Sequence, residues 1–261
     1  MAGMDEVLTL MQEVAAEVID PRFRALAAGE VDQKNPGDYV TIADRESELL
    51  LTAALPKLFP GAVVVGEEAS FLDPAILHRL QDEHVFLVDP VDGTMNFVKG
   101  SPNHGVMVAE LQHGEAVRSW IWQPQHGVAY LAERGAGARR RNATSEEALR
   151  VGAAPDQPRG ATSKRSRLGF DADGRLAPVV SSIWCVALDY PRVVEGQLDY
   201  LVYKNLKPWD HVPCTLLLRE AGGVAITFDG DDYRPASTGP GLIAAVSPEV
   251  AQLVVDTWQA P

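Results

Sequence analysis

The sequence predicts an α/β fold with an α+β first half and an α/β second half. Helical patterns open the chain, a series of short apolar strands follows, and strand-like and helix-like segments then alternate toward the C-terminus. The 261 residues are 46% hydrophobic and 23% charged, a composition typical of globular proteins that fold without disulfides.

The first two predicted elements are helices. Residues 4–26 carry apolar side chains at helical spacing, and Pro21 interrupts the pattern. A polar loop follows, and the next helix is predicted from Asp44 to about Leu58. The Asp44 carboxylate is expected to accept a hydrogen bond at the start of this helix.

Strands are predicted next. Ala62–Val65 is a short apolar run that ends in Gly66-Glu67-Glu68, and Val85–Val88 is another that ends in Asp89-Pro90. Both resemble buried strands that present carboxylates at their ends. Alternating runs follow and predict a mainly antiparallel sheet, at His104–Leu111, Val117–Trp122 and Val128–Ala132.

The polar, turn-rich stretch Gly135–Glu147 is the predicted boundary between two halves, residues 1–140 and 141–261. Beyond it, the alternation of strand-like and helix-like segments indicates an α/β half, with segments at Gly160, Trp184–Gly196, Leu198–Tyr203, Asp210–Gly222 and Leu242–Val246.

Composition and charge narrow the function classes. The formal net charge of -13 repels nucleic acid and acidic membranes, and no apolar run approaches membrane-spanning length. Asp5 and Glu6 stand where a secretion signal carries basic residues, so we expect a cytoplasmic protein without nucleic-acid or membrane partners. Cys185 and Cys214 lack zinc-site spacing and are expected to be buried thiols.

The segment around Asp89 and Asp92 is the most informative. An aliphatic strand leads into these two aspartates, and Pro90 and Gly93 indicate a stiff turn. Both carboxylates and the carbonyl of Val91 can then converge as hard oxygen ligands, which suit Mg²⁺ or Mn²⁺. The alternative is a surface turn whose aspartates serve only turn geometry.

A short helix is predicted directly after this turn. The backbone amides of Gly93 and Thr94 would form its first turn and favour a bound anion. Carboxylates from Asp44, Glu67 and Asp210 are expected nearby. Because ionised carboxylates at about 4 Å repel by about 1 kcal/mol in water and several-fold more in a shielded cleft, such a cluster requires cations.

Four motifs in register carry a resemblance to a known family. The set resembles the inositol monophosphatase family: Asp38–Asp44, Gly66–Glu68, Asp89–Phe97 and Lys207–Asp210, with Ala221–Gly223 further on. The resemblance implies a layered αβαβα sandwich, a homodimer, lithium inhibition, and hydrolysis of a small phosphorylated substrate by metal-activated water.

The resemblance also implies residue roles. The metal ligands for two or three Mg²⁺ ions, with Mn²⁺ possible, fall on Glu67, Asp89, the Val91 carbonyl, Asp92 and Asp210. Thr94 and Asp44, together with Glu67, are implied to position and activate the attacking water. Most ligands thus lie in residues 1–140, and Asp210 completes the site. The implied substrate contacts are Asp92, Gly93, Thr94, Asp210, Val186 and Tyr203.

Departures from the family pattern concern the substrate. Tyr203 stands where many members have a Glu that binds substrate hydroxyls, and Trp184-Cys185-Val186 replaces a small pocket-lining stretch. Inositol phosphate, sugar or polyol phosphate, fructose bisphosphate, histidinol phosphate and phosphoadenosine phosphate therefore all stay open. The alternative to catalysis is a non-catalytic regulatory protein of the same fold.

Overall fold

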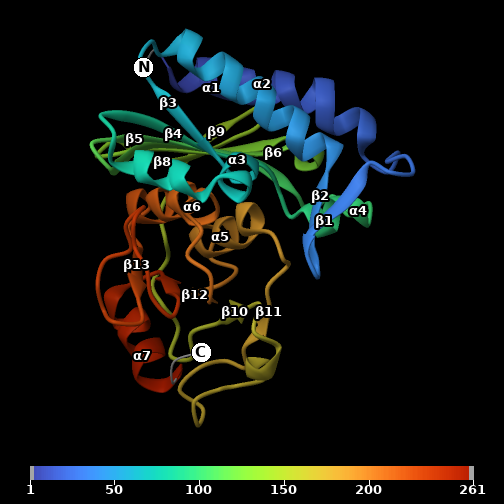
Figure 1. Ribbon diagram of the computed structural model, residues 1–261. Helices are drawn as coiled ribbons and strands as arrows, with labels where there is room; N and C mark the ends of the chain where they lie inside the picture. The colour runs from blue at the N-terminus through green and yellow to red at the C-terminus, as the bar shows by residue number, and fades with distance from the viewer. Residues whose placement is uncertain (1–2, 259–261) are drawn as a thin grey trace.

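Helices and sheets alternate in five layers over residues 3–258, the part of the chain that the computed structural model describes (Figure 1). Helices α1 (Met4–Val14) and α2 (Ile42–Leu58) cover one face of a large sheet. Helices α5 (Val186–Val194) and α6 (Pro208–Glu220) separate that sheet from a smaller one, whose outer face carries α7 (Pro248–Trp258). The α/β class and the layered sandwich are confirmed.

The large sheet has the strand order β3-β4-β5-β6-β7-β8-β9. Only the β3–β4 pair is parallel in this sheet, within the described residues, so the mainly antiparallel prediction is confirmed. The strands are β3 (Val63–Gly66), β4 (His84–Asp92), β5 (Gly105–Gln112), β6 (Glu115–Gln123), β7 (Val128–Glu133), β8 (Gly137–Arg141) and β9 (Glu146–Leu149).

The turn-rich stretch Gly135–Glu147 is largely strand, because it contributes β8 and the start of β9 to the large sheet. Its polar side chains are compatible with a strand at the sheet edge, where one face meets solvent. Arg141 and Glu146 form an ion pair across the two strands. The division at residues 140 and 141 stays a prediction; the large sheet itself continues to Leu149.

The burial of strand β4 on both faces explains its continuous apolar sequence. Val85 and Leu87 pack into the core that contains α5 and α6, whereas Phe86 and Val88 pack against α1 and α2. Alternate side chains of a strand point to opposite faces, so a strand covered on both sides is apolar throughout. Each such side chain contributes about 1.5–3 kcal/mol on full burial, and this anchors the carboxylates at the end of β4.

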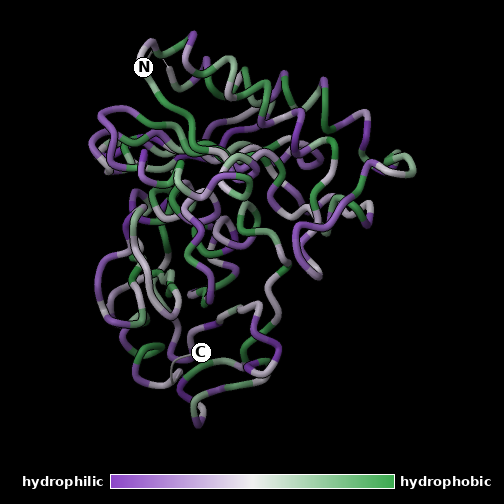
Figure 2. Tube along the Cα trace, in the orientation of Figure 1, coloured by the Kyte–Doolittle hydropathy of each residue, from purple (hydrophilic) through white to green (hydrophobic). Residues whose placement is uncertain are grey.

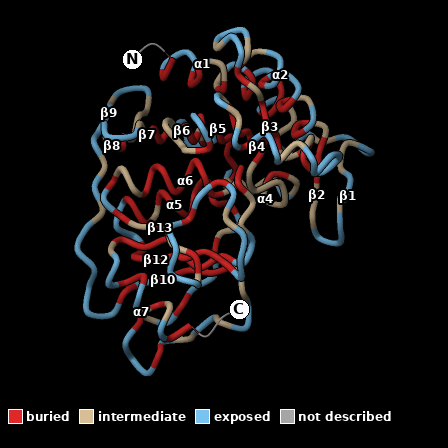
Figure 3. Tube along the Cα trace, turned by 60° about the vertical axis from the view of Figure 1, so that its left-hand side comes forward, coloured by how far each residue is buried: buried red, intermediate tan, exposed pale blue. Residues whose placement is uncertain are grey.

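The smaller sheet has the order β11-β10-β12-β14-β13. Its strands are β10 (Gly160–Thr162), β11 (Val180–Ser181), β12 (Tyr200–Tyr203), β13 (Val224–Thr227) and β14 (Leu242–Ala245). Strand β10 runs parallel to β11 and β12, and β14 runs antiparallel to β12 and β13. Figure 3 shows α5, α6 and β12 as buried, which agrees with their position between the outer layers.

The remaining elements connect these layers. A hairpin of β1 (Val31–Asn35) and β2 (Asp38–Thr41) projects from the body and is hydrophilic toward its tip (Figure 2). Short helices are α3 (Glu67–Leu72) and α4 (Thr94–Val98), with 3-10 turns at Pro74–Gln81, Pro124–His126 and Arg165–Arg167. Within residues 3–258 no helix combines the length and the apolar character that a bilayer crossing requires.

The N-terminal helices largely follow the prediction. After α1 the chain continues as a π-helix at Ala15–Ile19 and a 3-10 turn at Asp20–Arg22, so the interruption near Pro21 is confirmed. Helix α2 begins at Ile42, two residues before the predicted start. Thr41 caps it, and Asp44 accepts the backbone N–H of Thr41 in a reciprocal capping box.

Candidate active site

Three carboxylates converge where helix α6 packs against the large sheet. Glu67, Asp89 and Asp210 each offer an oxygen, and these oxygens lie within 4.8 Å of one another. Glu67 begins α3, Asp89 lies in β4, and Asp210 lies in the first turn of α6. Residues separated by more than a hundred positions in sequence are therefore brought together by the packing of α6 against the large sheet.

Asp89 is the least compensated of the three. Its side chain is 1% exposed, and Oδ1 has no hydrogen-bond partner among residues 3–258. Burial raises the pKa of Asp89 well above its usual range, and the charges of Glu67 and Asp92 raise it further. A buried oxygen without a donor, facing other carboxylates, fits a hard divalent cation.

Glu67 is positioned by a buried carboxylate that the sequence did not reveal. The side chain of Glu48 accepts the backbone N–H groups of Glu68 and Ala69, both at 2.8 Å, and so caps the start of α3. Glu48 lies so close to Gly66 that a Cβ there would be 2.2 Å from its carboxyl carbon. Gly66 is thus required for this approach.

Two lysines contact Glu67. Lys34 from the β1–β2 hairpin lies 3.0 Å from Glu67 Oε1 and 2.7 Å from Glu68 Oε1, and Lys207 lies 3.4 Å from Glu67 Oε1. Burial alone would lower the pKa of Lys34, but the attraction of both glutamates outweighs it and raises the pKa. The hairpin therefore brings positive charge to an otherwise acidic site. Neither lysine was among the predicted site residues, although Lys207 belongs to a recognised motif.

Asp44 and Thr94 form a hydrogen-bonded pair across the site. The hydroxyl of Thr94 lies 3.0 Å from Asp44 Oδ1 and 3.0 Å from the carbonyl oxygen of Val91. Asp44 is 1% exposed, and burial raises its pKa to about 7 in spite of the hydrogen bonds from Thr41. The pair predicted from the sequence thus exists as a contact.

The predicted turn at Asp89–Asp92 is a bulged strand instead. β4 continues to Asp92, and its pairing with β5 is irregular between Asp89 and Asp92. A bulge re-aims side chains much as a turn does, while the strand keeps its pairing. Gly93 follows in the left-handed region with φ of 79°, and the predicted short helix α4 begins at Thr94.

Asp92 faces the second half of the chain. Its Oδ2 accepts the backbone N–H of Ala187 at 2.7 Å and lies 2.9 Å from the thiol of Cys185. Burial raises the pKa of Asp92 to about 6, while these hydrogen bonds oppose the rise. Asp92 is close enough to raise the pKa of Asp89, but it lies outside the 4.8 Å cluster.

A cavity of about 200 Å³ opens beside these carboxylates. Its lining includes Asp92, Asp210, Val186 and Tyr203, which were predicted as substrate contacts, together with Trp184. The hydroxyl of Tyr203 donates to Asp189 at 2.8 Å. The cavity therefore joins four of the six predicted substrate residues beside the carboxylate cluster, whereas Gly93 and Thr94 are not among its lining residues.

His211 also lines this cavity but has both ring nitrogens engaged. Nδ1 lies 3.1 Å from the Tyr190 hydroxyl, and Nε2 lies 2.9 Å from the carbonyl oxygen of Asn205. Burial lowers the pKa of His211 to about 4, so the ring is neutral at physiological pH. These contacts agree with a structural histidine.

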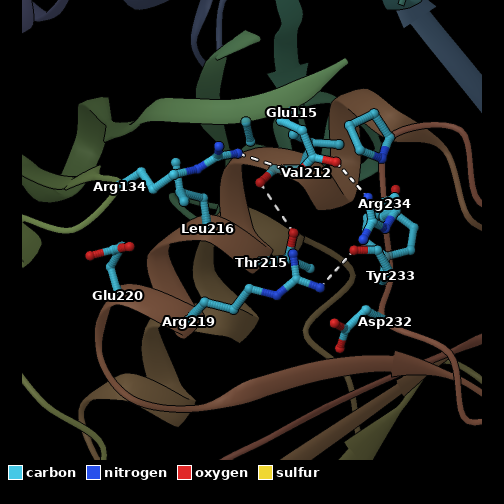
Figure 4. A pocket seen from close by; sticks show the side chains of 12 residues that line it. Glu115, Arg134, Val212, Thr215, Leu216, Arg219, Glu220, Asp232, Tyr233 and Arg234 are labelled. Carbon is cyan, nitrogen blue, oxygen red and sulfur yellow. Dashed lines mark hydrogen bonds and ion pairs between the residues drawn. The ribbon is translucent and has the colours of Figure 1, made fainter. Parts of the chain in front are cut away.

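A different cavity, of about 250 Å³, lies along α6 away from its first turn (Figure 4). Glu115 pairs there with Arg234 at 2.6 Å and with Arg134 at 3.4 Å, and Arg219 donates to the carbonyl oxygen of Tyr233. Acidic and basic groups are balanced in this lining, and none of the predicted site residues belongs to it.

Comparison with known proteins identifies the fold and the family. The sequence model of the inositol monophosphatase family matches residues 2–259. The chain belongs to this family. An inositol-1-monophosphatase of Rhizobium meliloti is 31% identical over 241 residues, covering 89% of this chain and 87% of the relative.

Another relative in the family is not named as a phosphatase. A putative Nus factor SuhB of Neisseria meningitidis is 30% identical over 247 residues, covering 86% of each chain. Among solved structures, an inositol monophosphatase of Thermotoga maritima superposes with a TM-score of 0.79 at 25% identity and 99% coverage of both chains. The resemblance read from the motifs is thus confirmed, as is the family fold.

Proposed function

We propose that this protein is a Mg²⁺-dependent phosphomonoesterase that hydrolyses a small phosphorylated metabolite. The observation that carries the proposal is the convergence of Glu67, Asp89 and Asp210 within 4.8 Å, together with the contact between Asp44 and Thr94. A site that only held a structural cation would have no use for a buried hydroxyl–carboxylate pair beside the ligands. Family membership and phosphatase-named relatives support the same conclusion.

We expect the site to hold two or three Mg²⁺ ions, with Mn²⁺ as an alternative. In this proposal the ligands are Glu67, Asp89, the carbonyl of Val91, Asp92 and Asp210, all of them hard oxygen donors. Bound divalent ions lower the pKa of a coordinated water and neutralise charge on a phosphoryl group.

The chain's own groups would orient the water. Asp44 accepts a hydrogen bond from the Thr94 hydroxyl, so the lone pairs of Thr94 Oγ1 are available to a water molecule. Glu67 supplies a second acceptor and completes the predicted catalytic set. The backbone amides of Gly93 and Thr94 would bind the phosphate, with Asp92 and Asp210 on the alcohol side.

The test is phosphate release from a panel of phosphate monoesters in the presence of Mg²⁺. Wild type should hydrolyse at least one member, and chelation of the metal should abolish this activity. Asp92→Asn should lower kcat by orders of magnitude, whereas the exposed Asp229→Asn should leave it unchanged. Release of phosphate from no ester, by protein that binds Mg²⁺, would contradict the proposal.

A second candidate is a non-catalytic regulatory role, favoured by the relatives that are named Nus factor SuhB. Asp92→Asn separates the two candidates in a strain that lacks the native gene. Rescue of the strain's phenotype by folded but inactive Asp92→Asn would favour regulation; failure of rescue would favour catalysis. The homodimer, the cytoplasmic location and lithium inhibition complete the proposal, and a sedimentation experiment, cell fractionation and a LiCl titration test them.

A further inference from the structure

An aromatic side chain stands at the edge of the cavity beside the carboxylates. Trp184 lines this cavity together with Asp92 and Asp210, and 51% of the residue is exposed to solvent. Single exposed apolar residues are common on protein surfaces, so exposure alone says little. Because Trp184 lies next to the proposed metal ligands, its ring is a candidate contact for the substrate.

The backbone of Trp184 is held in an unfavourable conformation. Its φ of 60° lies in the left-handed region, which bulky L-residues rarely adopt. Such conformations persist where surrounding contacts impose them, and they concentrate at ligand-binding sites. Here the Trp184 N–H donates to the hydroxyl oxygen of Ser182 at 2.9 Å, and that hydroxyl donates in turn to Asp189.

Asp189 is the centre of the network that fixes this conformation. It is fully buried and also accepts the Tyr203 hydroxyl at 2.8 Å and the Arg192 guanidinium at 3.0 Å. The Asp189 carboxylate and the Tyr203 hydroxyl are therefore committed to each other. These two groups are therefore not free to bind the hydroxyls of a polyol.

We propose, on the basis of the proposed phosphatase function, that Trp184 stacks on the alcohol part of the substrate and selects phosphate esters whose alcohol carries a flat, unsaturated ring. Such a ring gains contact area and favourable stacking on an indole face. A saturated polyol ring instead needs hydrogen-bond partners for each hydroxyl that it buries. Ser163, Lys204 and Asn205 line the same cavity and supply polar groups for the edge of a flat ring.

The experiment compares two kinds of ester on wild type, Trp184→Phe, Trp184→Leu and the exposed control Leu168→Ala. Histidinol phosphate and adenosine monophosphate carry flat rings; inositol 1-phosphate and glycerol 3-phosphate do not. For flat-ring esters, Trp184→Leu should raise KM about tenfold and Trp184→Phe by about threefold or less. For the two esters without a flat ring and for Leu168→Ala, KM should stay within about twofold of wild type.

Two results would overturn the inference while the phosphatase function stands. One is an equal change of KM for both kinds of ester in Trp184→Leu. The other is an unchanged KM together with an altered molecular mass in solution, since the exposed ring would then serve assembly. Thermal unfolding of each variant shows whether it is folded. If Trp184→Leu does not fold, Trp184→Phe still provides the test.

A binding measurement separates failure of the inference from failure of the proposed function. Tryptophan fluorescence is titrated with histidinol phosphate in wild type and in Trp184→Phe. Quenching in wild type that is absent in Trp184→Phe supports stacking, even if no ester is hydrolysed. Equal quenching in both proteins, or none in wild type, contradicts it.

Discussion

Replacing Asp89 with asparagine should stabilise the metal-free protein while abolishing its response to Mg²⁺. The ligand oxygens of Glu67, Asp89 and Asp210 lie within 4.8 Å of one another. Two unit charges at that separation repel by about 3 kcal/mol at an effective dielectric constant of about 20. Asparagine has the shape of aspartate without the charge, and its amide can donate to the neighbouring carboxylates.

Proton binding limits the size of this effect. Burial and the neighbouring carboxylates raise the pKa of Asp89 well above its ordinary 3.8, so the folded protein relieves the repulsion by holding a proton there. Keeping this proton lowers the free energy of unfolding by about 1.4 kcal/mol for each pH unit above 3.8. At pH 7 the loss of stability therefore cannot exceed about 4 kcal/mol. We therefore expect a gain of about 2–4 kcal/mol, or a rise in Tm of about 5–10 °C.

Thermal unfolding in EDTA, with and without added Mg²⁺, provides the measurement. Wild type should gain stability with Mg²⁺, and Asp89→Asn should gain much less, since one ligand is weakened. The exposed Asp229→Asn should match wild type throughout. The gain of Asp89→Asn in EDTA should shrink toward zero as the pH falls to about 4, where the unfolded carboxyl also holds a proton. A lower metal-free Tm for Asp89→Asn at pH 7 would refute the reasoning.

Three further predictions concern the surroundings of the cluster. Asp44→Asn should lower kcat by about 10²–10⁴-fold with little loss of Tm, because the Thr94 hydroxyl loses its carboxyl acceptor; phosphate-release kinetics test this. Gly93→Ala should destabilise the fold by about 2–4 kcal/mol in urea unfolding, since a Cβ at φ of 79° would lie 3.0 Å from that of Cys185. Burial lowers the pKa of His104 to about 4, so its neutral ring contributes stability that is complete above pH 6.5 and is lost as the pH falls toward 4. Urea unfolding at pH 5 and pH 7 should show this loss in wild type, by roughly 1–3 kcal/mol, and a smaller loss in His104→Phe.

The elements that the sequence predicted well are those whose pattern is set by local burial. Strand β4 reads as a continuous aliphatic run because both of its faces are covered. The carboxylates that follow it were recognisable because Asp44, Glu67 and Asp210 stand at the ends of other predicted elements and recur in the motifs of the family. Buried Cys185 and Cys214 follow the same logic, since a thiol without ligand spacing behaves as a small apolar residue.

What the sequence did not reveal depends on contacts between distant residues. Glu48 resembles any polar residue of a helix, and only the packing of α2 beside α3 turns it into the cap that fixes Glu67. Lys34 lies in a polar hairpin whose position over the carboxylates cannot be read from composition. The strands β8 and β9 were missed because their residues are polar and turn-like, and their pairing is set by the neighbouring strand β7.

The position of the carboxylates couples the proposed chemistry to the assembly of the fold. Asp89 belongs to the first sheet, whereas Asp210 belongs to the helix layer between the two sheets, so the cluster exists only when these layers are packed together. Without a cation their mutual repulsion opposes that packing; with one, the same groups hold the layers together. The substrate cavity lies on the same boundary, between Asp92 of the first sheet and Tyr203 of the second. Binding of metal and binding of substrate should therefore both stabilise the interface from which the site is built.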